Sequence, residues 1–276
     1  MRRLVAALAL CVCVEAGASE APRRIVSINM CTDQLLLDMV PPARILGLSP
    51  YAGDAVRSWV ADKAASLPKL SGTAEEVLIL KPDLVLLSRY MKPETLDFIR
   101  RRGIPHAEFD DVRSLEEAKA QILVFGTRVG EAEAAEARVE AIETALQGLR
   151  ATAAATGIRV LPLARRGWVA GKETLMSDLL AKAGLSNAAA ELGIQDGGFV
   201  SLEAIVKLRP DAILVARDDL SSEDQGAAMM LHPAIQALFP PERRLYLSEK
   251  LTVCGGPMLA EAIRQLATQI GALKKR

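Results

Sequence analysis

The sequence predicts an α/β protein of two lobes, each with a mostly parallel central sheet, joined by one long α-helix with a ligand cleft between the lobes. Three observations predict this fold. Two distant segments share one pattern, apolar strand-like runs alternate with helix-like runs in both halves, and a long amphipathic helix separates the halves. A cleft between two lobes is a common place for a ligand to bind.

The repeated pattern covers residues 73–87 and 201–215, which align without a gap. Glu75 aligns with Glu203, and both segments contain a Pro-Asp pair, at residues 82–83 and 210–211. Each copy reads as an N-cap residue, a short helix, a turn at the Pro-Asp pair and an apolar strand. A weaker correspondence relates residues 24–28 to 159–163, each a predicted strand followed by a loop and a helix.

The long helix is predicted over residues 131–155. Its apolar residues recur at spacings of three and four, which places them on one stripe of an α-helix. The stripe consists of Val139, Ile142, Leu146, Leu149 and Ala153. We therefore expect a helix with one buried side that connects the lobes.

Composition is that of an ordinary globular protein. The 276 residues are 50% hydrophobic and 25% charged, and the formal net charge is zero. A nucleic-acid footprint or a polybasic membrane anchor would require an excess of positive charge. We expect a monomer that binds no nucleic acid.

The first 18 residues resemble a secretory signal. Arg2 and Arg3 precede an apolar run at residues 4–14 and small residues at 16–18. The apolar run is too short to cross a bilayer. We expect cleavage after Ala18, no later membrane segment and a periplasmic protein.

Residues 24–115 form the predicted N-terminal lobe. Strands are expected at residues 24–28, 44–48 and 105–109, and helices at 32–40 and 93–102. The helix and the strand of the first copy of the repeat are expected within residues 73–88. Residues 116–156 form a helical linker that includes the long helix, and Ser114 with Glu117 is a capping-box pattern at its start.

Residues 157–276 form the predicted C-terminal lobe. Strands are expected at residues 159–163 and 244–247, and helices at 173–183, 233–238 and 257–270. The helix and the strand of the second copy of the repeat are expected within residues 201–216. Pro257 suits the first turn of the last helix, where no backbone donor is needed.

Five blocks, in order, resemble periplasmic solute-binding proteins of ABC importers for ferric siderophores, haem and cobalamin. The blocks are residues 24–28, 47–51, 80–85, 169–173 and 200–211. The resemblance implies the two-lobed fold, capture of a metal chelate, and delivery to a permease dimer with its ATPase subunits. It implies neither catalysis nor a cofactor.

Several residues are candidates for contact with such a ligand. The resemblance points to Tyr51 and Glu249, and Trp168 precedes one of the family blocks. The arginines and Tyr90 follow strands, at the sheet edge where α/β proteins bind ligands. These are Arg89, Tyr90, Arg165 and Arg166. Arg suits anionic oxygens of a chelate, although solvated surface arginines and a core tryptophan are the alternative interpretations.

Glu75 and Glu203 match the family position at which a glutamate on each lobe docks on arginines of the permease. Both also lie two residues after an N-cap, where a carboxylate interacts favourably with the helix dipole. Glu76 is the weaker candidate because it is spaced to form a capping box with Thr73.

Cys31 and Cys254 depart from the usual family pattern. In an oxidising compartment they are a candidate disulfide, which would tie the lobes together. Alternatively, two thiols in the cleft would contact the ligand. This alternative allows a second function, a thiol-dependent enzyme or a ligand sensor on the same scaffold using Cys31.

His106 and His232 are the two histidines of the sequence. Carriers of free zinc or manganese need several histidines, and both of these read as structural or surface residues. We expect no metal site built from protein side chains and no catalytic residues.

Overall fold

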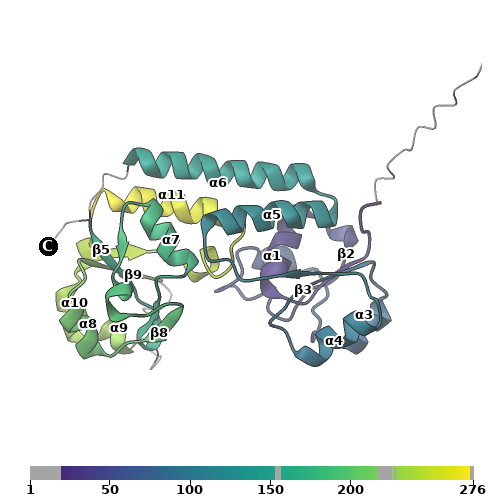
Figure 1. Cartoon of the computed structure of the whole chain (residues 1–276), viewed down its shortest axis with the longest axis horizontal. Helices are drawn as coiled ribbons and strands as arrows, with labels where there is room; N and C mark the ends of the chain where they lie inside the picture. The colour runs from purple at the N-terminus through teal and green to yellow at the C-terminus, as the bar shows by residue number, and fades with distance from the viewer. Residues whose placement is uncertain (1–19, 153–156, 217–225, 227, 274–276) are drawn as a thin grey trace, which may run out of the picture.

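The computed structural model describes residues 20–152, 157–216, 226 and 228–273. The predicted signal at residues 1–18 and a charged segment at residues 218–225, predicted as a loop, lie outside the described residues. The described chain forms two α/β lobes, drawn at the two ends of the long axis in Figure 1, beneath the helix α6.

The N-terminal lobe contains one four-stranded parallel sheet in the order β2-β1-β3-β4. Its strands are β1 (Ile25–Ser27), β2 (Ile45–Gly47), β3 (Leu84–Ser88) and β4 (His106–Phe109). Its helices are α1 (Met30–Met39), α2 (Ala61–Ala64), α3 (Ala74–Leu80) and α4 (Pro93–Arg101). The predicted elements of this lobe are present, with ends shifted by one or two residues.

The C-terminal lobe contains a second four-stranded parallel sheet in the order β10-β9-β5-β7. Its strands are β5 (Arg159–Pro162), β7 (Ser186–Asn187), β9 (Ala212–Val215) and β10 (Arg244–Tyr246). Its helices are α7 (Leu175–Lys182), α8 (Leu202–Leu208), α9 (Ala228–Leu231), α10 (Pro233–Leu238) and α11 (Leu259–Ile270). Read from β7, the order matches that of the first lobe, with β5 and β9 in the places of β1 and β3.

The central strands are apolar throughout because both of their faces are covered. In β3, Leu84 and Leu86 face the largest core cluster, whereas Val85 and Leu87 belong to a separate cluster with helices α3 and α4. In β9, Leu214 likewise belongs to the largest core cluster, whereas Ile213 belongs to a separate cluster of the second lobe. The near-continuous apolar runs in the sequence therefore reflect burial on two sides.

A repeated clamp closes the helix-to-strand turn of each lobe, between α3 and β3 and between α8 and β9. In the first lobe, Arg24 N donates to Asp83 Oδ1 at 2.9 Å, and the Arg24 guanidinium donates to the carbonyls of Leu80 and Lys81. In the second lobe, Arg159 N donates to Asp211 Oδ2 at 2.9 Å. The weaker sequence correspondence between residues 24–28 and 159–163 is thus a structural one.

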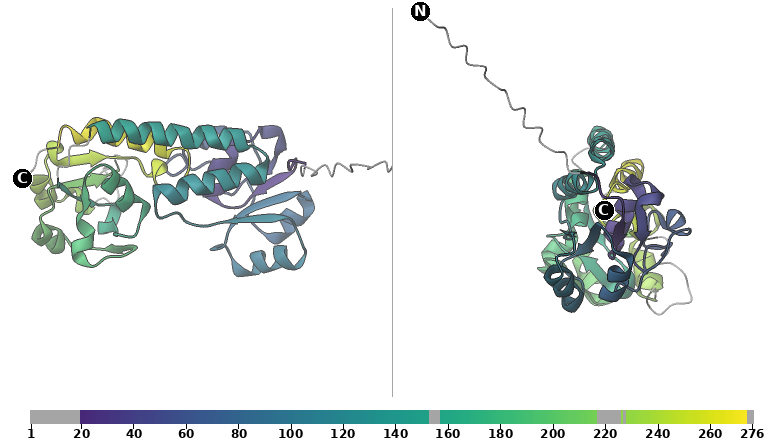
Figure 2. Two further views of the ribbon diagram at one scale, coloured as in Figure 1. Left: turned by 45° about the horizontal axis from the view of Figure 1, so that its top comes forward. Right: turned by 90° about the vertical axis from the view of Figure 1, so that its right-hand side faces the viewer.

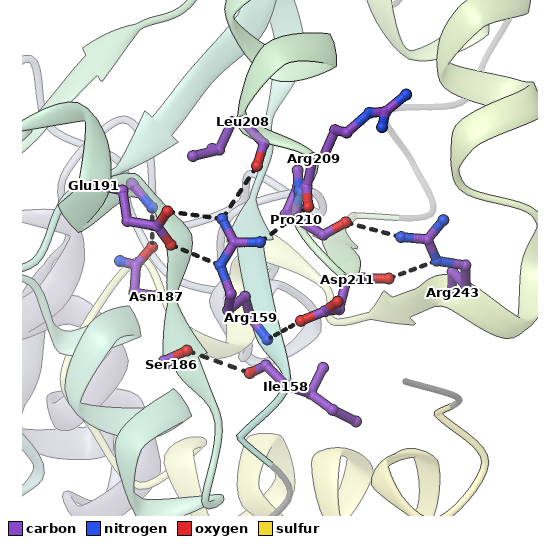
Figure 3. Close-up of polar contacts among 11 residues, drawn as sticks. Ile158, Arg159, Ser186, Asn187, Glu191, Leu208, Arg209, Pro210, Asp211 and Arg243 are labelled. Atoms are coloured by element: carbon purple, nitrogen blue, oxygen red, sulfur yellow. Dashed lines mark hydrogen bonds and ion pairs between the residues drawn. The ribbon is translucent and has the colours of Figure 1, made fainter. Parts of the chain in front are cut away.

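The second copy of the clamp extends the same contacts (Figure 3). The Arg159 guanidinium donates to the carbonyls of Leu208 and Arg209, as Arg24 does to their counterparts. It also forms two bonds of 2.7 Å to the carboxylate of Glu191. The residue before each Pro-Asp pair, Lys81 or Arg209, has a left-handed backbone with φ near 50° and ends its helix.

Three helices join the lobes. Helix α5 (Leu115–Val129) runs back along α6 (Ala132–Thr152), and α6 packs on α5 over one lobe and on α11 over the other (Figures 1 and 2). The predicted stripe is buried at Ile142, Leu146 and Leu149, while Ala153 lies outside the described residues. One core cluster continues from Ile25 of the first sheet to Leu245 of the second.

Some elements differ from the prediction. An antiparallel hairpin of β6 (Trp168–Ala170) and β8 (Gly197–Phe199), which the sequence patterns did not predict, covers the second lobe. Glu76 accepts hydrogen bonds from Ser71 and Gly72, so the predicted capping box with Thr73 is half formed. Helix α11 begins at Leu259, two residues after Pro257.

In the part of the chain that the structure describes, no helix has the length and apolar character needed to cross a membrane.

Candidate functional site: the cavity between the lobes

A cavity with a volume of about 840 Å³ lies between the two lobes. Most of its lining is apolar. Its described lining comprises Tyr90, Asp111, Val112, Arg113, Pro162, Leu163, Ala164, Arg165, Trp168, Ala170, Glu173, Thr174, Leu175, Met176, Asp196, Leu214, Ala216, Leu247, Glu249, Thr252 and Val253.

Both sheets direct the carboxyl ends of their strands toward this cavity. Tyr90 follows β3 and Asp111 follows β4, while Pro162, Leu214 and Leu247 lie at or just after the ends of β5, β9 and β10. In parallel sheets this edge is where ligands bind, because the strands end there in loops that approach one another. The cavity is therefore the strongest candidate for the functional site.

An ion-pair cluster crosses the cavity from one lobe to the other. Arg113, between β4 and α5, contacts Asp196 at 2.8 Å and Glu173 at 3.8 Å from the second lobe. All three side chains are more than half exposed, so water and salt weaken these contacts. The cluster marks a rim at which the lobes already touch.

Backbone contacts hold the acidic half of this cluster together. Glu173 N donates to the carbonyl of Gln195 at 2.8 Å, and Gly171 N donates to the carbonyl of Asp196 at 2.9 Å. These bonds bring residues 171–173 and 194–196 side by side, so two carboxylates lie near each other. A second contact between the lobes follows, from Leu115 N to Asp178 Oδ2 at 2.8 Å.

The β6–β8 hairpin presents Trp168 to the cavity. The indole lies against Gly197, where a Cβ would come within 2.2 Å of the ring. A residue other than glycine would push the indole away, so Gly197 sets the position of this aromatic wall. Trp168 remains 38% exposed, whereas Phe199, paired with it across the hairpin, is 70% exposed.

Four of the predicted ligand contacts lie on the cavity wall. They are Tyr90, Arg165, Trp168 and Glu249, and they come from both lobes. Tyr90 is 70% exposed, and its backbone N–H donates to Ser88 Oγ. Whether these side chains bind a ligand stays a prediction.

Three other predicted contacts lie elsewhere. Arg89 pairs with Asp110, and neither residue lines the cavity. Tyr51 is 58% exposed on a loop outside the lining. Arg166 has a left-handed backbone with φ of 59°, which sends the chain from β5 into the hairpin. Following a strand was thus insufficient to place a side chain in the cavity.

Cys31 and Cys254 form a disulfide with a Cα–Cα distance of 5.3 Å. This corrects the interpretation of the two residues as ligand-contacting thiols, and neither lines the cavity. It also removes the basis for a thiol-dependent function, because the sulfur of Cys31 is already bonded and has no proton to lose.

The disulfide fastens a turn of the second lobe to the first lobe. Gln34 Nε2 of α1 donates to Cys254 Sγ at 3.3 Å. Gly255 is so close to the other lobe that a Cβ there would meet Val112 Cγ2 at 1.8 Å. Val253, next to the disulfide, lines the cavity. The bond therefore holds one end of the cavity wall in place.

The two glutamates singled out by the repeat occupy matching sites. Glu75 and Glu203 are exposed at the second position of α3 and α8, after the N-caps Thr73 and Ser201. Hydrogen bonds from its own backbone N–H and from the Ser201 hydroxyl lower the pKa of Glu203. Both positions agree with a capping role as well as with a docking role.

The histidines make local contacts. His232 Nδ1 accepts from Ala234 N at the start of α10, and His106 Nδ1 lies 2.8 Å from the carbonyl of Ile104. Among the described residues, no three side chains of His, Cys, Asp or Glu are grouped to hold a metal ion.

The sequence reasoning missed Asp111, Arg113, Glu173 and Asp196. Asp111 and Arg113 follow β4, so the strand-end rule that selected Tyr90 would have found them. Glu173 and Asp196 carry no such signal, because they meet through the pairing of two loops.

Comparisons with known proteins agree with the fold. A family model described as "Periplasmic binding protein" matches residues 25–239. The periplasmic heme-binding protein RhuT from Roseiflexus sp. RS-1 superposes with a TM-score of 0.74 at 27% identity, covering 91% of this chain and 99% of that one. A search of curated proteins found no match.

Two solved structures from Vibrio cholerae share the fold at lower identity. The periplasmic heme-binding protein HutB has a TM-score of 0.71 at 22% identity, covering 90% of this chain and 97% of that one. The periplasmic vitamin B12-binding protein BtuF has a TM-score of 0.70 at 18% identity, covering 91% of this chain and 97% of that one.

Proposed function

Because the chain belongs to the periplasmic binding protein family, we propose that it captures a metal chelate between its lobes and delivers it to the permease dimer of an ABC importer. The observation that carries this proposal is the cavity of about 840 Å³ at the carboxyl ends of both sheets. The relatives' names support the ligand class, since they include heme-binding and vitamin B12-binding proteins. The proposed ligand is haem, cobalamin or a ferric siderophore.

The ligand is held by aromatic and apolar surface with a few polar groups. Tyr90 from the first lobe and Trp168 from the second offer ring faces to a large planar or bulky chelate. Apolar residues such as Leu163, Met176 and Val253 cover the rest of the wall. This composition matches that of small-molecule sites, which are mostly apolar with few directing polar groups.

Ligand capture involves small movements of the lobes. Helix α6 packs along both α5 and α11, and one core cluster spans the lobes. The disulfide and the Arg113 cluster join the lobes on separate segments. A wide hinge opening would break this shared core, so the cavity changes shape mainly through its exposed loops.

Delivery uses Glu75 and Glu203 as a two-point docking contact with basic residues of the permease. Their equivalent positions in the two lobes support this role, because a dimeric partner presents each contact twice. Exposed charge pairs contribute about 0.2–1 kcal/mol each, so the glutamates orient the complex more than they hold it.

Export to the periplasm is proposed to depend on residues 1–18. The charged start, the apolar run and the small residues before position 19 support their removal as a signal. The mature chain then meets an oxidising compartment, which suits the disulfide.

Titration of the mature protein with haemin, cyanocobalamin and ferric siderophores tests the function. Binding is measured by tryptophan fluorescence and by calorimetry. We expect saturable quenching by one class of chelate. Trp168 lines the cavity and Trp59 does not, so Trp168→Phe should lose most of the quenching and Trp59→Phe should retain it. Absence of saturable binding to every chelate would contradict the proposal.

A further inference from the structure

The charges on the cavity wall are unequal in sign. Among the described lining residues, four are acidic and two are basic, which leaves a formal excess of two negative charges. The acidic residues are Asp111, Glu173, Asp196 and Glu249, and the basic ones are Arg113 and Arg165. Neither lysine nor histidine occurs in this described lining.

One of the two arginines is already engaged with carboxylates. Arg113 contacts both Asp196 and Glu173, so this cluster is formally negative with its guanidinium included. Outside the lining, Arg89 is neutralised by Asp110. Of the three arginines that the sequence suggested for an anionic ligand, Arg89, Arg165 and Arg166, the described lining contains Arg165 alone, so they do not form a positive wall.

The rest of the wall is suited to a large body of low polarity. Twelve lining residues are apolar, and Tyr90, Thr174 and Thr252 add hydroxyl groups. Hydroxyls and carboxylates both accept hydrogen bonds from amide N–H or ammonium groups. An anionic group would instead lose its hydration beside like charges, which is unfavourable.

We propose that the cavity selects metal chelates of neutral or positive net charge over anionic ones. This inference rests on the proposed function and narrows its ligand class. A corrinoid with amide side chains, or a hydroxamate complex with a free ammonium group, fits the wall. Haem, with two carboxylates, and ferric tris-catecholates, with a high negative charge, meet repulsion there. A cleft with one dominant sign of charge focuses this effect on its ligand.

Binding to four probes of different charge tests the inference. The probes are cyanocobalamin, ferrioxamine B, haemin and ferric enterobactin, measured by calorimetry at low and at high salt. We expect saturable binding of a neutral or cationic probe and at least about tenfold weaker binding of the anionic ones. For a cationic probe, added salt should reduce the preference, because exposed charges are screened.

The outcomes separate this inference from the proposed function. Tightest binding of haemin or ferric enterobactin would overturn the charge selection and leave a chelate-binding protein. Absence of saturable binding to every probe would overturn both. A matched pair removes differences of shape: cyanocobalamin and its derivative with hydrolysed propionamides share one ring, and the carboxylate form should bind more weakly. Equal affinity for the two forms would overturn the charge selection.

A double variant tests whether the wall charges are responsible. Asp111→Asn with Glu249→Gln removes two lining charges and leaves the Arg113 cluster intact. We expect the affinity for the hydrolysed corrinoid to approach that for cyanocobalamin, a gain of about three- to tenfold. Glu136→Gln with Glu140→Gln, on the exposed face of α6, removes the same charge elsewhere and should change neither affinity. Equal effects of the two double variants would overturn the inference.

Discussion

The two lobes share one strand order but place their polar groups differently. Among the described residues, the buried polar side chains all belong to the first lobe. They are Ser27, Thr32, Asp33, Gln34, Ser49, Ser58, Ser88 and Thr95. In the second lobe a polar network surrounds Arg159 at the periphery, where Glu191 and Arg243 join the clamp (Figure 3).

Buried polar side chains of the first lobe form hydrogen bonds that hold the loop after β2 in place. Asp33 accepts hydrogen bonds from the backbone N–H and the hydroxyl of Ser49, at 3.2 and 2.5 Å. Gln34 Oε1 accepts from Trp59 N at 2.9 Å. Helix α1 thus holds both ends of the segment from residue 49 to 59 by hydrogen bonds, while Ala52 within the segment packs into the core.

This difference between the lobes shows that the repeat preserves the backbone elements and not the residues that line the cavity. The strand–helix unit with its Pro-Asp turn recurs in both lobes, and so do the exposed glutamates. The cavity is unequal, because the first lobe contributes four of the described lining residues and the second lobe the others. The two similar lobes therefore enclose one cavity whose described wall belongs mostly to the second lobe.

Removing the covalent bond between the lobes should have the largest effect. The variant with Cys31→Ser and Cys254→Ser opens a loop closed over a sequence separation of 223 residues. We expect the free energy of unfolding to fall by about 4–5 kcal/mol, measured by urea denaturation against oxidised wild type. Wild type treated with a reductant is the matched control and should show a similar loss. A change below about 1 kcal/mol would contradict a stabilising tether.

The buried carboxyl group of the first lobe should make stability depend on pH. Burial raises the pKa of Asp33 from 3.8 to about 6. Between these two values the unfolded chain loses the proton and the folded chain keeps it, so stability falls as pH rises, by up to about 3 kcal/mol. Above about pH 6 the difference levels off.

The variant Asp33→Asn should remove this contribution. Urea midpoints at pH 4.5 and pH 7 would show a smaller loss than in wild type, whereas Asp97→Asn, at an exposed position of α4, should behave as wild type. An unchanged pH profile in Asp33→Asn would show that another group controls it.

The clamp arginines allow a direct comparison of the lobes. Arg159→Ala loses the paired bonds to Glu191 and two bonds to carbonyls. We expect a loss of about 2 kcal/mol, against about 1 kcal/mol for Arg24→Ala, which loses two bonds to carbonyls at an exposed site. In a Glu191→Ala background, the loss of stability caused by Arg159→Ala should come closer to that caused by Arg24→Ala. Equal losses in Arg24→Ala and Arg159→Ala would mean that the Glu191 pair adds nothing.

Substitution of the two glutamates proposed to dock on the permease should affect stability least. Glu75→Ala with Glu203→Ala should change the free energy of unfolding by less than about 1 kcal/mol, because both side chains are exposed. Chelate affinity should be unchanged, while uptake through the importer should fall. Glu76→Ala, whose side chain bonds Ser71, is the matched control for helix capping. Normal uptake in the double variant would reject the docking role.

Much of the fold could be predicted because its signals are local. Apolar runs next to the Pro-Asp turns located β3 and β9, and the stripe through Ile142 and Leu149 located α6. The β6–β8 hairpin escaped prediction since Gly197 and Gly198 favour turns, and the place of Gly197 in a strand depends on room for Trp168.

The cavity could be predicted only in part. Strand ends indicated Tyr90 and Arg165, and the structure brings both to the wall. The same rule selected Arg89, whose pairing with Asp110 depends on the neighbouring strand β4. Glu173 and Asp196 meet because two loops pair, which no local spacing encodes.

The disulfide has a consequence for the integrity of the molecule. Gly130 connects α5 to α6 in the backbone. The disulfide between Cys31 and Cys254 is a second covalent link between the segments before and after Gly130. A protein nicked at a protease site engineered there remains one covalent molecule. It separates into two fragments on a denaturing gel after reduction, so a single backbone cut leaves both walls of the cavity attached to each other.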